Sequence, residues 1–375
     1  MTTHTGGERL RVAFVMEIGL GHTTLYKLFQ STVAQDPTIV PTWLPIEFGK
    51  HELLAHIPKL RNDIVLRGGV SGWRKLRAAL RHQRFDAIFF HTQMIAVFCS
   101  AIMRRTPTIV SIDGTPSQFA AFGEHYGLPD PKRTSWRERL RERWYKDVFQ
   151  SAACVVAISQ WGIDAAITEY GVTREAARVI YPGVDLQKWM PGKKRDNGKL
   201  RLLFVGGEFR RKGGDLLLRW MRERGCSHCE LDVVTGTDVE PTPGTTVHRG
   251  FGPNDPRLIE LYRSADLFVL PTRADMASLV AMEAMASGIP VVSTRVGAIP
   301  EWLGAPGDAG FVVDPDDYDG LARTLDDLTV DRSRLRAMGA RARKRAETHF
   351  DGQANMRQEL SLVREVAQAA SRSTT

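Results

Sequence analysis

The sequence has 375 residues, of which 43% are hydrophobic, so it is long enough for two packed domains or slightly more. It contains no run of 18 apolar residues, which excludes a transmembrane helix, and residues 1–9 lack the apolar core of a secretion signal. Residues 1–195 hold 27 Lys and Arg against 17 Asp and Glu, so the net charge of +8 arises in the first half. We therefore expect a cytoplasmic protein whose first half favours an anionic surface or substrate.

The first half alternates short apolar runs with helical patterns. The apolar runs predict strands at residues 12–16, 39–43, 87–90, 108–112, 155–158 and 178–181. Helical patterns fall between them, for example at residues 73–82 and 94–103. Short buried strands separated by helices indicate βαβ units and a mostly parallel sheet.

A second α/β alternation follows residues 181–197, which are rich in Pro, Gly and charge and read as an interdomain linker. We expect strands at residues 200–205, 231–234, 267–270, 291–293 and 311–313. Helices should cover roughly residues 215–224, 256–264, 279–287, 318–328 and 332–348. Residues 355–370 form an amphipathic pattern with Leu360, Val363 and Val366 on one face. The expected architecture is two Rossmann-like domains with a cleft between them.

The segment 271–302 carries two acidic residues where a strand leads through a loop into a helix. Asp275 lies in the expected loop, and Glu283 lies in the helix that follows. Ligands of α/β sheets bind beyond the carboxyl ends of the strands, where helix amides are free to hold phosphate. Carboxylates there can accept hydrogen bonds from sugar hydroxyls. Phosphate and sugar together suggest a nucleotide-sugar.

A cluster of glycine and cationic residues follows the first strand of the second half. Gly206 and Gly207 would let the backbone approach a ligand, and Arg210, Arg211 and Lys212 can clamp a diphosphate. The alternative is a solvated cationic turn.

Three loops of the first half directly follow expected strands and should border the cleft. Gly19, Gly21 and His22 follow the first strand, but a nicotinamide-binding motif would need glycine at position 24, which is Thr24. This spacing argues against a dehydrogenase. His91 and Asp113 follow the third and fourth expected strands.

The order of these motifs resembles the family 4 glycosyltransferases, which are retaining sugar-nucleotide enzymes with the GT-B fold. The resemblance rests on an acidic residue, seven intervening residues and a Glu, followed by Ala-Met-Ala and Gly-x-Pro-Val-Val, which here span residues 275–292. The motif Gly-x-Ile-Pro-Glu follows at residues 297–301. The resemblance implies an acceptor-binding domain at residues 1–182, a donor domain at residues 183–350, and a final helix at residues 351–375 that returns to the first domain. The two parallel sheets would face each other across the cleft.

The resemblance also implies residue roles. Asp275 would bind the transferred sugar and Glu283 the ribose, while Lys212 and Arg211, with Arg210 as the alternative, would stabilise charge on the diphosphate. The donor would further contact Gly19, Gly21, Gly206, Gly207, Phe251, Ser278, Leu279 and Val280. His22, His91 and Asp113 would lie on the acceptor side. Two departures are visible: Met276-Ala277-Ser278 replaces Gly-Phe-Gly, and Gly207 stands where many relatives carry Arg.

By this resemblance the chain would move a sugar from a nucleoside diphosphate to an acceptor hydroxyl by front-face substitution, with retention at the anomeric carbon. The acceptor would be a glycan, a lipid-linked molecule or a small molecule. We expect no metal and no cofactor besides the nucleotide-sugar co-substrate, and no nucleic-acid partner. A nucleotide-sugar epimerase and a non-catalytic nucleotide-sugar-binding protein remain as alternatives.

Residues 132–146 hold seven Lys and Arg and two Glu, with Trp136, Leu140 and Trp144 spaced every four residues. A helix would align these three side chains on one face. Two interpretations stay open: the stripe packs inward, or the helix lies on the anionic face of the cytoplasmic membrane.

Overall fold

The computed structural model describes residues 9–19, 22–48, 63–126, 135–194 and 198–373. As far as these residues are described, the chain forms two compact units. The first comprises Met1–Ala121, Pro129–Ile180 and Met356–Thr375, and the second comprises Phe122–Leu128 and Tyr181–Asn355. Residues 122–126 thus belong to the second unit although they precede the linker by more than fifty positions in the sequence.

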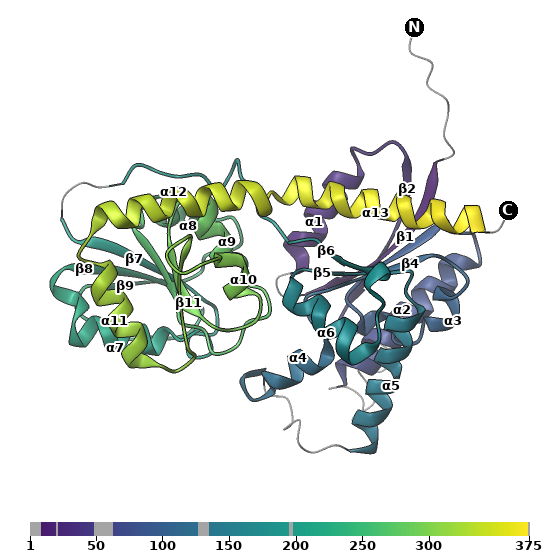
Figure 1. Cartoon of the computed structure of the whole chain (residues 1–375), viewed down its shortest axis with the longest axis horizontal. Helices are drawn as coiled ribbons and strands as arrows, with labels where there is room; N and C mark the ends of the chain where they lie inside the picture. Colours follow the sequence, from purple (N-terminus) through teal and green to yellow (C-terminus); the bar gives the residue numbers. More distant parts are fainter. Residues whose placement is uncertain (1–8, 20–21, 49–62, 127–134, 195–197, 374–375) are drawn as a thin grey trace, which may run out of the picture. The chain divides into compact units, whose positions relative to one another are not determined.

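The first unit is built on a six-stranded parallel sheet with the order β2-β1-β3-β4-β5-β6 (Figure 1). Its strands are β1 (Leu10–Ile18), β2 (Ile39–Glu47), β3 (Ala87–His91), β4 (Thr108–Ile112), β5 (Cys154–Ala157) and β6 (Ala177–Val179). Every residue of β3, β4 and β5 is buried, as expected for parallel strands covered on both faces.

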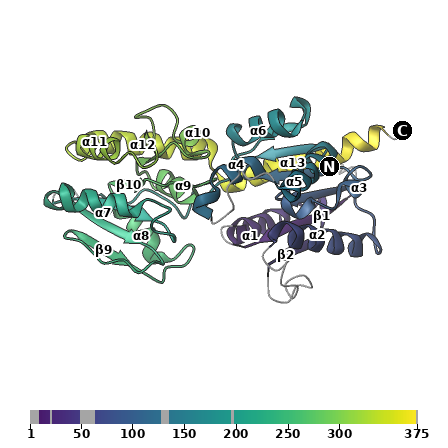
Figure 2. The same cartoon turned by 90° about the horizontal axis from the view of Figure 1, so that it is seen from below.

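Helices cover both faces of this sheet (Figures 1 and 2). They are α1 (His22–Val33), α2 (Ile64–Leu80), α3 (Ser100–Met103), α4 (Pro116–Ala121), α5 (Trp136–Ser151) and α6 (Gln160–Tyr170). Ala13 and Val15 of β1 pack in one apolar cluster with side chains of α2, α3, α5 and α6. Val12 and Phe14 point the other way, into a cluster that includes α1 and the last helix, α13 (Gly352–Ser373). The alternation of β1 therefore separates two cores.

Helix α2 begins nine residues before the predicted start. The prediction was late because Gly68, Gly69 and Gly72 are poor helix formers. These glycines are buried, and a Cβ at Gly72 would lie 2.1 Å from the carbonyl oxygen of Ile95. The helix thus uses missing side chains to approach its neighbour. The helix predicted at residues 94–103 is also wrong, because that stretch forms a 3₁₀ turn (Met94–Ala96) followed by the short α3.

The second unit repeats the plan with the strand order β12-β11-β10-β7-β8-β9, again all parallel. Its strands are β7 (Leu200–Val205), β8 (Cys229–Val234), β9 (Thr245–His248), β10 (Leu267–Leu270), β11 (Val291–Thr294) and β12 (Gly310–Val313). Its helices are α7 (Gly214–Glu223), α8 (Pro256–Ser264), α9 (Leu279–Ala286), α10 (Ile299–Leu303), α11 (Tyr318–Leu328) and α12 (Arg332–His349). The edge strand β9 was not among the predicted strands, because none of its residues is fully buried and its pattern is polar.

The linker packs on the second unit, and the last helix belongs to the first unit. Trp189, in the segment expected to be a linker, is buried against the ring of Tyr262, with ring centroids 5.0 Å apart. After α12, the chain enters α13, whose Met356, Leu360 and Val363 join the core of the first unit. No helix of the described part of the chain has the length and apolar character needed to cross a membrane.

The structure of helix α5 supports each of the two interpretations of residues 132–146 for a different part of the helix. It begins after Ser135, which forms a capping box with Glu138, so residues 132–134 of the stretch lie outside the described residues. Trp144 packs on the core and meets the ring of Phe98 at 5.1 Å. Trp136 is 65% exposed and Leu140 is 36% exposed. The stripe is therefore divided between an inward-packed end and an exposed end.

Candidate functional site

The candidate site of the second unit lies where β7 and β10 end. The loop after β7 runs from Gly206 to Gly213 and leads into α7, and the loop after β10 leads into α9. Because β7 and β10 are adjacent and parallel, both loops lie at the carboxyl edge of the sheet. Ligands of open α/β sheets bind at this edge.

Glycine brings the two loops into contact. Gly213 has a φ of +76°, and a Cβ there would lie 1.9 Å from the carbonyl oxygen of Pro271. Gly297, with a φ of +55°, approaches Asp275 so closely that its Cβ would lie 2.2 Å from the carbonyl oxygen. Only glycine fits such positions. The close approach places Lys212 beside Asp275.

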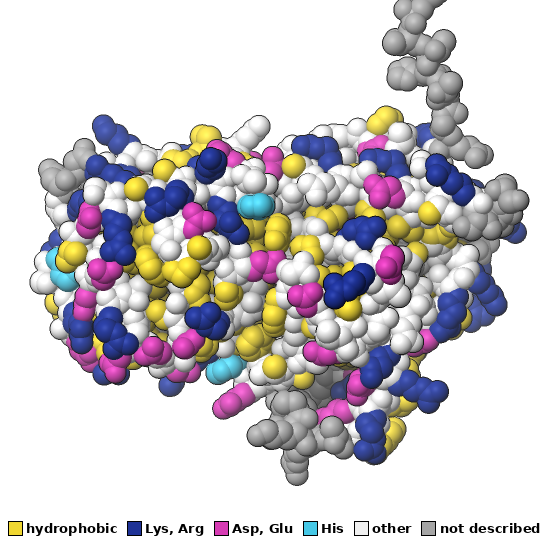
Figure 3. All heavy atoms as spheres, in the orientation of Figure 1, with side chains coloured by type: hydrophobic (Ala, Val, Ile, Leu, Met, Phe, Trp, Pro, Cys, Tyr) yellow, Lys and Arg dark blue, Asp and Glu magenta, His cyan; other side chains and the backbone are white. Residues whose placement is uncertain are grey.

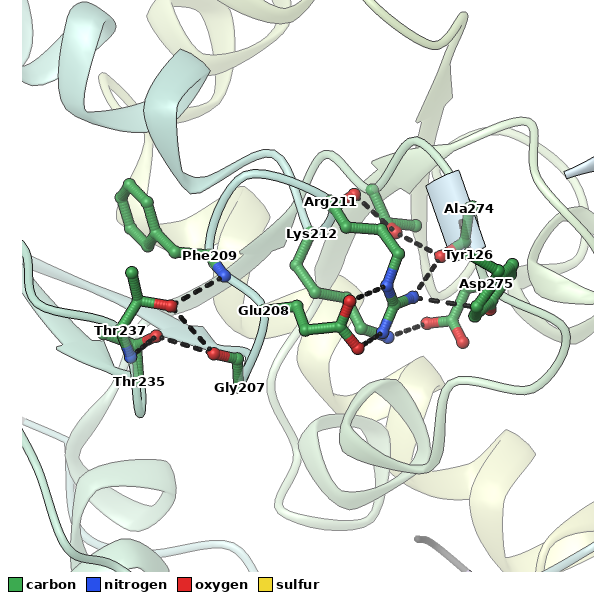
Figure 4. Close-up of polar contacts among 11 residues, drawn as sticks. Tyr126, Gly207, Glu208, Phe209, Arg211, Lys212, Thr235, Thr237, Ala274 and Asp275 are labelled. Carbon is green, nitrogen blue, oxygen red and sulfur yellow. Dashed lines mark hydrogen bonds and ion pairs between the residues drawn. The ribbon is translucent and has the colours of Figure 1, made fainter. Parts of the chain in front are cut away.

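Two of the three cations predicted for this loop point at the Asp275 loop (Figure 4). Lys212 Nζ lies 2.5 Å from Asp275 Oδ2, and both side chains are largely buried. Arg211 Nη1 donates to the carbonyl oxygen of Ala274 at 2.6 Å. Arg210 instead is exposed, so the arrangement favours Arg211 over Arg210 as the second cation.

Arg211 also holds two groups that the sequence did not indicate. Its Nε and Nη2 donate to the two carboxylate oxygens of Glu208, each at 2.9 Å. Its guanidinium carbon lies 4.8 Å from the ring centroid of Tyr126, and Nη1 lies 3.4 Å from the Tyr126 hydroxyl. A cation over an aromatic face is a favourable contact. Glu208 and Tyr126 thus complete the surroundings of Arg211.

The backbone of Gly207 is held by hydrogen bonds, and the structure leaves room for a side chain at this position. Its carbonyl oxygen accepts hydrogen bonds from the hydroxyls of Thr235 at 3.3 Å and Thr237 at 3.1 Å (Figure 4). A Cβ at Gly207 would meet no atom within 4 Å. Gly206 differs, since a Cβ there would lie 2.9 Å from Lys212 Cβ.

Helix α9 starts without a side-chain cap. Ser278 occupies the N-cap, its side chain bonds none of the helix amides, and its buried Oγ has no partner among the described residues. Leu279 and Val280 form the first turn, where backbone amides lack partners within the helix. An open helix N-terminus with an unpaired hydroxyl suits an anionic ligand.

Glu283 lies one turn further along α9 and is partly buried. Burial raises the pKa of its carboxyl to about 8, against a hydrogen bond with Tyr262 that lowers it. Burial thus favours the protonated, neutral form of this carboxyl. A neutral carboxyl can both donate and accept a hydrogen bond, as a pair of hydroxyls requires.

Phe251 follows β9 and already has neighbours. Its ring centroid lies 5.6 Å from that of His248 and 4.3 Å from the guanidinium carbon of Arg257. The His248 ring in turn hydrogen-bonds Asp232, with Nε2 2.7 Å from Oδ1.

The candidate site residues of the first unit lie at or directly after the carboxyl ends of its strands. Gly19 follows β1, His91 ends β3 and is buried, and Asp113 follows β4. Gly21 lies outside the described residues, and His22 begins α1 although its side chain is not described.

Sequence reasoning missed two residues at the same edge. Thr92, directly after β3, has a φ of +83°, which is an outlier for a β-branched residue. Its hydroxyl donates to Glu17 Oε2 at 2.6 Å. Such strain concentrates at functional positions. An acidic residue near the end of β1, after five apolar residues, was the available signal.

Acidic residues with a spacing that resembles a metal-binding motif follow the last strand of the second unit. Asp314 and Asp316, and then Asp317 and Asp319, follow β12 with Asp-x-Asp spacing that the sequence prediction overlooked. Asp316 pairs with Arg273, Asp314 pairs with Arg295, and Asp317 caps α11. Among the described residues no group of three or more His, Cys, Asp or Glu is arranged to hold a metal ion.

Two family models match the chain along most of its length. The model described as Glycosyltransferase Family 4 matches residues 41–188, and the model described as Glycosyl transferases group 1 matches residues 193–331. The chain belongs to the family 4 glycosyltransferases. The chain is similar to the MMP alpha-(1->4)-mannosyltransferase of Mycolicibacterium hassiacum, with 31% identity over 236 residues. This alignment covers 58% of the chain and 57% of the relative, so the chain spans little more than half of that curated relative's length.

Solved structures place this family 4 chain in the GT-B fold. Sucrose-phosphate synthase from Thermosynechococcus elongatus matches with a TM-score of 0.74 at 18% identity, covering 96% of this chain and 100% of that one. Anabaena Alr3699/HepE in complex with UDP matches with a TM-score of 0.69 at 17% identity, covering 95% and 100%. The predicted fold class, two Rossmann-like α/β units with parallel sheets, is confirmed.

Proposed function

We propose that this chain transfers a sugar from a nucleoside diphosphate to an acceptor hydroxyl, with retention of configuration. The observation that carries the proposal is the meeting of Lys212, Arg211 and Asp275 beside the uncapped start of α9. Cations and helix amides suit a diphosphate, and an adjacent carboxylate suits sugar hydroxyls. Family membership supports the same chemistry.

The proposed reaction needs no enzymic base. The bond between the anomeric carbon and the phosphate oxygen breaks, and the acceptor oxygen bonds the same face of that carbon. The acceptor proton moves to the departing phosphate oxygen. Negative charge grows on that phosphate, so Lys212 and Arg211 stabilise the transition state more than the ground state. We propose that these cations and the α9 amides supply this stabilisation in place of a metal ion.

The proposed donor is a nucleoside-diphosphate sugar, bound by Asp275 through the sugar and by Glu283 through the ribose. The fold relative from Anabaena binds UDP, which makes UDP-sugars a first choice for testing. The acceptor is proposed as a hydroxyl of a glycan, a lipid-linked molecule or a small molecule. Gly19, His91 and Asp113 lie at the sheet edge where the first unit would present it.

A binding screen followed by product analysis tests this proposal. UDP, GDP and ADP and their hexose conjugates are titrated into the protein by calorimetry, and the anomeric configuration of any product is read by NMR. Lys212→Ala should lower turnover about 10²- to 10³-fold, as loss of one transition-state donor does. Glu283→Ala should weaken nucleotide binding. Wild-type rates in both folded variants would show that the site is elsewhere.

Other results would favour the two alternatives. Conversion of the donor to a new sugar nucleotide without acceptor would indicate an epimerase. Nucleotide binding without turnover for any acceptor would indicate a binding protein. An inverted product anomer would contradict retention.

We also propose that the exposed end of α5 contacts an anionic lipid surface. Trp136 and Leu140 are exposed there, and Arg137, Arg139 and Arg143 are exposed on the same helix. Figure 3 shows Lys and Arg side chains beside hydrophobic ones in the region of α5. Exposed aromatic and basic side chains together fit the headgroup region of an anionic membrane.

Vesicle co-sedimentation tests this contact. The protein should sediment with vesicles that contain phosphatidylglycerol and not with phosphatidylcholine alone, and less so at high salt. The double substitution Trp136→Ser and Leu140→Ser should reduce binding. Val330→Ser serves as the matched control, because Val330 is 81% exposed on the second unit. Equal sedimentation of both variants would rule out α5 as the lipid-binding surface.

A further inference from the structure

Both cations proposed to hold the diphosphate already hold a carboxylate. Arg211 forms a two-bond pair with Glu208, and Lys212 forms an ion pair with Asp275 (Figure 4). Charge-assisted pairs of this kind are among the stronger hydrogen bonds in proteins. An incoming diphosphate must therefore compete with two internal anions.

The two carboxylates differ sharply in exposure. The Glu208 side chain is 64% exposed, whereas that of Asp275 is 8% exposed. Glu208 can turn into water when its cation is taken, because an exposed carboxylate is readily hydrated. Asp275 cannot, and a buried carboxylate without a partner is strongly unfavourable.

Arg211 keeps its place when Glu208 leaves. The carbonyl oxygen of Ala274 and the ring of Tyr126 hold the guanidinium independently of Glu208. Its cationic edge would then face the ligand without a rearrangement of the loop. Hydrogen bonding from Arg211 keeps the pKa of Glu208 below its ordinary value, so this carboxylate is ionised and competes at neutral pH.

We propose that the donor binds by counter-ion exchange. The diphosphate displaces Glu208 from Arg211 into water, and it takes Lys212 from Asp275. Asp275, which stays buried, then accepts hydrogen bonds from the hydroxyls of the transferred sugar. Glu208 is thus a residue that sets affinity for the diphosphate, and Asp275 makes sugar and diphosphate binding interdependent. This inference rests on the proposed function, since it takes the diphosphate of a sugar nucleotide as the ligand.

The exchange has a consequence for selectivity. A free nucleoside diphosphate would take Lys212 and leave Asp275 without a partner. The sugar nucleotide supplies hydroxyl donors to the same carboxylate. The protein should therefore discriminate against the free diphosphate, which is also the product of the reaction.

Calorimetric titration of UDP, UDP-glucose, GDP and GDP-mannose into wild type and two variants tests the exchange. Glu208→Gln should tighten binding of a diphosphate and its sugar conjugate by the same factor, about threefold, as expected for loss of a partly exposed competitor. Asp275→Asn should tighten binding of the free diphosphate about tenfold and that of the sugar conjugate much less.

The matched control is Glu230→Gln. Glu230 pairs with Arg201 at 3.7 Å near the amino ends of β8 and β7. The substitution therefore removes the same charge as Glu208→Gln, but at the opposite end of the sheet. This variant should bind nucleotides like wild type.

The outcomes separate the two proposals. If no nucleotide binds to wild type or to any variant, the proposed function fails. If nucleotides bind but Glu208→Gln does not tighten them beyond Glu230→Gln, the exchange is wrong while the function stands. Equal effects of Asp275→Asn on the free diphosphate and the sugar conjugate would also overturn the exchange.

Discussion

At the scale of single residues, Gly207 stands where the resemblance to the family led us to expect Arg. The position can accept a side chain, because a Cβ there meets no atom within 4 Å and its φ lies outside the left-handed region. We predict that Gly207→Arg folds normally and binds nucleoside diphosphates more tightly, since it adds a third cation to Arg211 and Lys212. Calorimetry with UDP and GDP measures the change.

The control for this prediction is a glycine of the same loop that cannot be replaced. Gly213 has a positive φ and no room for a Cβ beside Pro271. Gly213→Ala should lower the thermal midpoint strongly, whereas Gly207→Ala should not. Weaker nucleotide binding by a stable Gly207→Arg variant would contradict the prediction.

The sequence predicted which residues gather at the candidate site better than it predicted their contacts. Arg211, Lys212 and Asp275 were identified from local patterns, and the structure brings these three together. Glu208 and Tyr126 were not identified. Tyr126 lies 85 positions from Arg211 in the sequence, and Asp275 lies 63 positions from Lys212. Which partner a charged side chain selects over such separations depends on tertiary packing, which local patterns do not encode.

At the scale of secondary-structure elements, α2 provides a test in which helix propensity and packing predict opposite signs. In an exposed helix, Gly→Ala stabilises by about 1 kcal/mol. At Gly72 the added Cβ would lie 2.1 Å from the backbone oxygen of Ile95. We therefore predict that Gly72→Ala destabilises the protein by about 1–3 kcal/mol, because overpacking shifts the helix from its neighbour. Urea unfolding measures the difference.

The control substitution on the same helix is Arg74→Ala, which changes an exposed side chain. It should change the free energy of unfolding by less than about 0.5 kcal/mol. A stabilised Gly72→Ala variant would show that propensity outweighs packing at this position.

The elements themselves followed from the sequence where burial was complete or nearly so. Strands β3, β4, β7 and β10 match the predicted ranges closely, because most of their residues are apolar and follow one another without interruption. The prediction failed where an element departs from that pattern. The first half of helix α2 contains three glycines, and β9 is a polar edge strand.

At the scale of the whole molecule, a buried carboxyl group makes stability depend on pH. Glu359 of α13 is 6% exposed, and its Oε2 has no partner among the described residues. Burial raises its pKa from 4.5 to about 8. The folded state therefore holds a proton that the unfolded state has lost between these two values. The contribution of Glu359 to stability should be full below about pH 4.5 and should fall as pH rises toward 8, by up to about 1.4 kcal/mol per pH unit.

We predict that Glu359→Gln flattens this dependence, because the amide does not ionise. Thermal midpoints measured from pH 5 to pH 9 give the slope, which should be smaller than in wild type. The remaining slope should come partly from Glu283, whose pKa is also raised to about 8. Glu365→Gln, an exposed site on the same helix, should leave the slope unchanged. Parallel curves for wild type and Glu359→Gln would contradict the assignment.

The return of α13 to the first unit also bears on the order of events during synthesis. The first unit has its sheet encoded before residue 180, but one of its two cores includes Met356, Leu360 and Val363. The ribosome makes about 5–20 residues each second, so residues 181–355 emerge while that core still lacks a helix. The second unit, later in the gene, can finish folding before the first. A nascent chain stalled before residue 356 should therefore expose apolar surface of its earliest strands to chaperones.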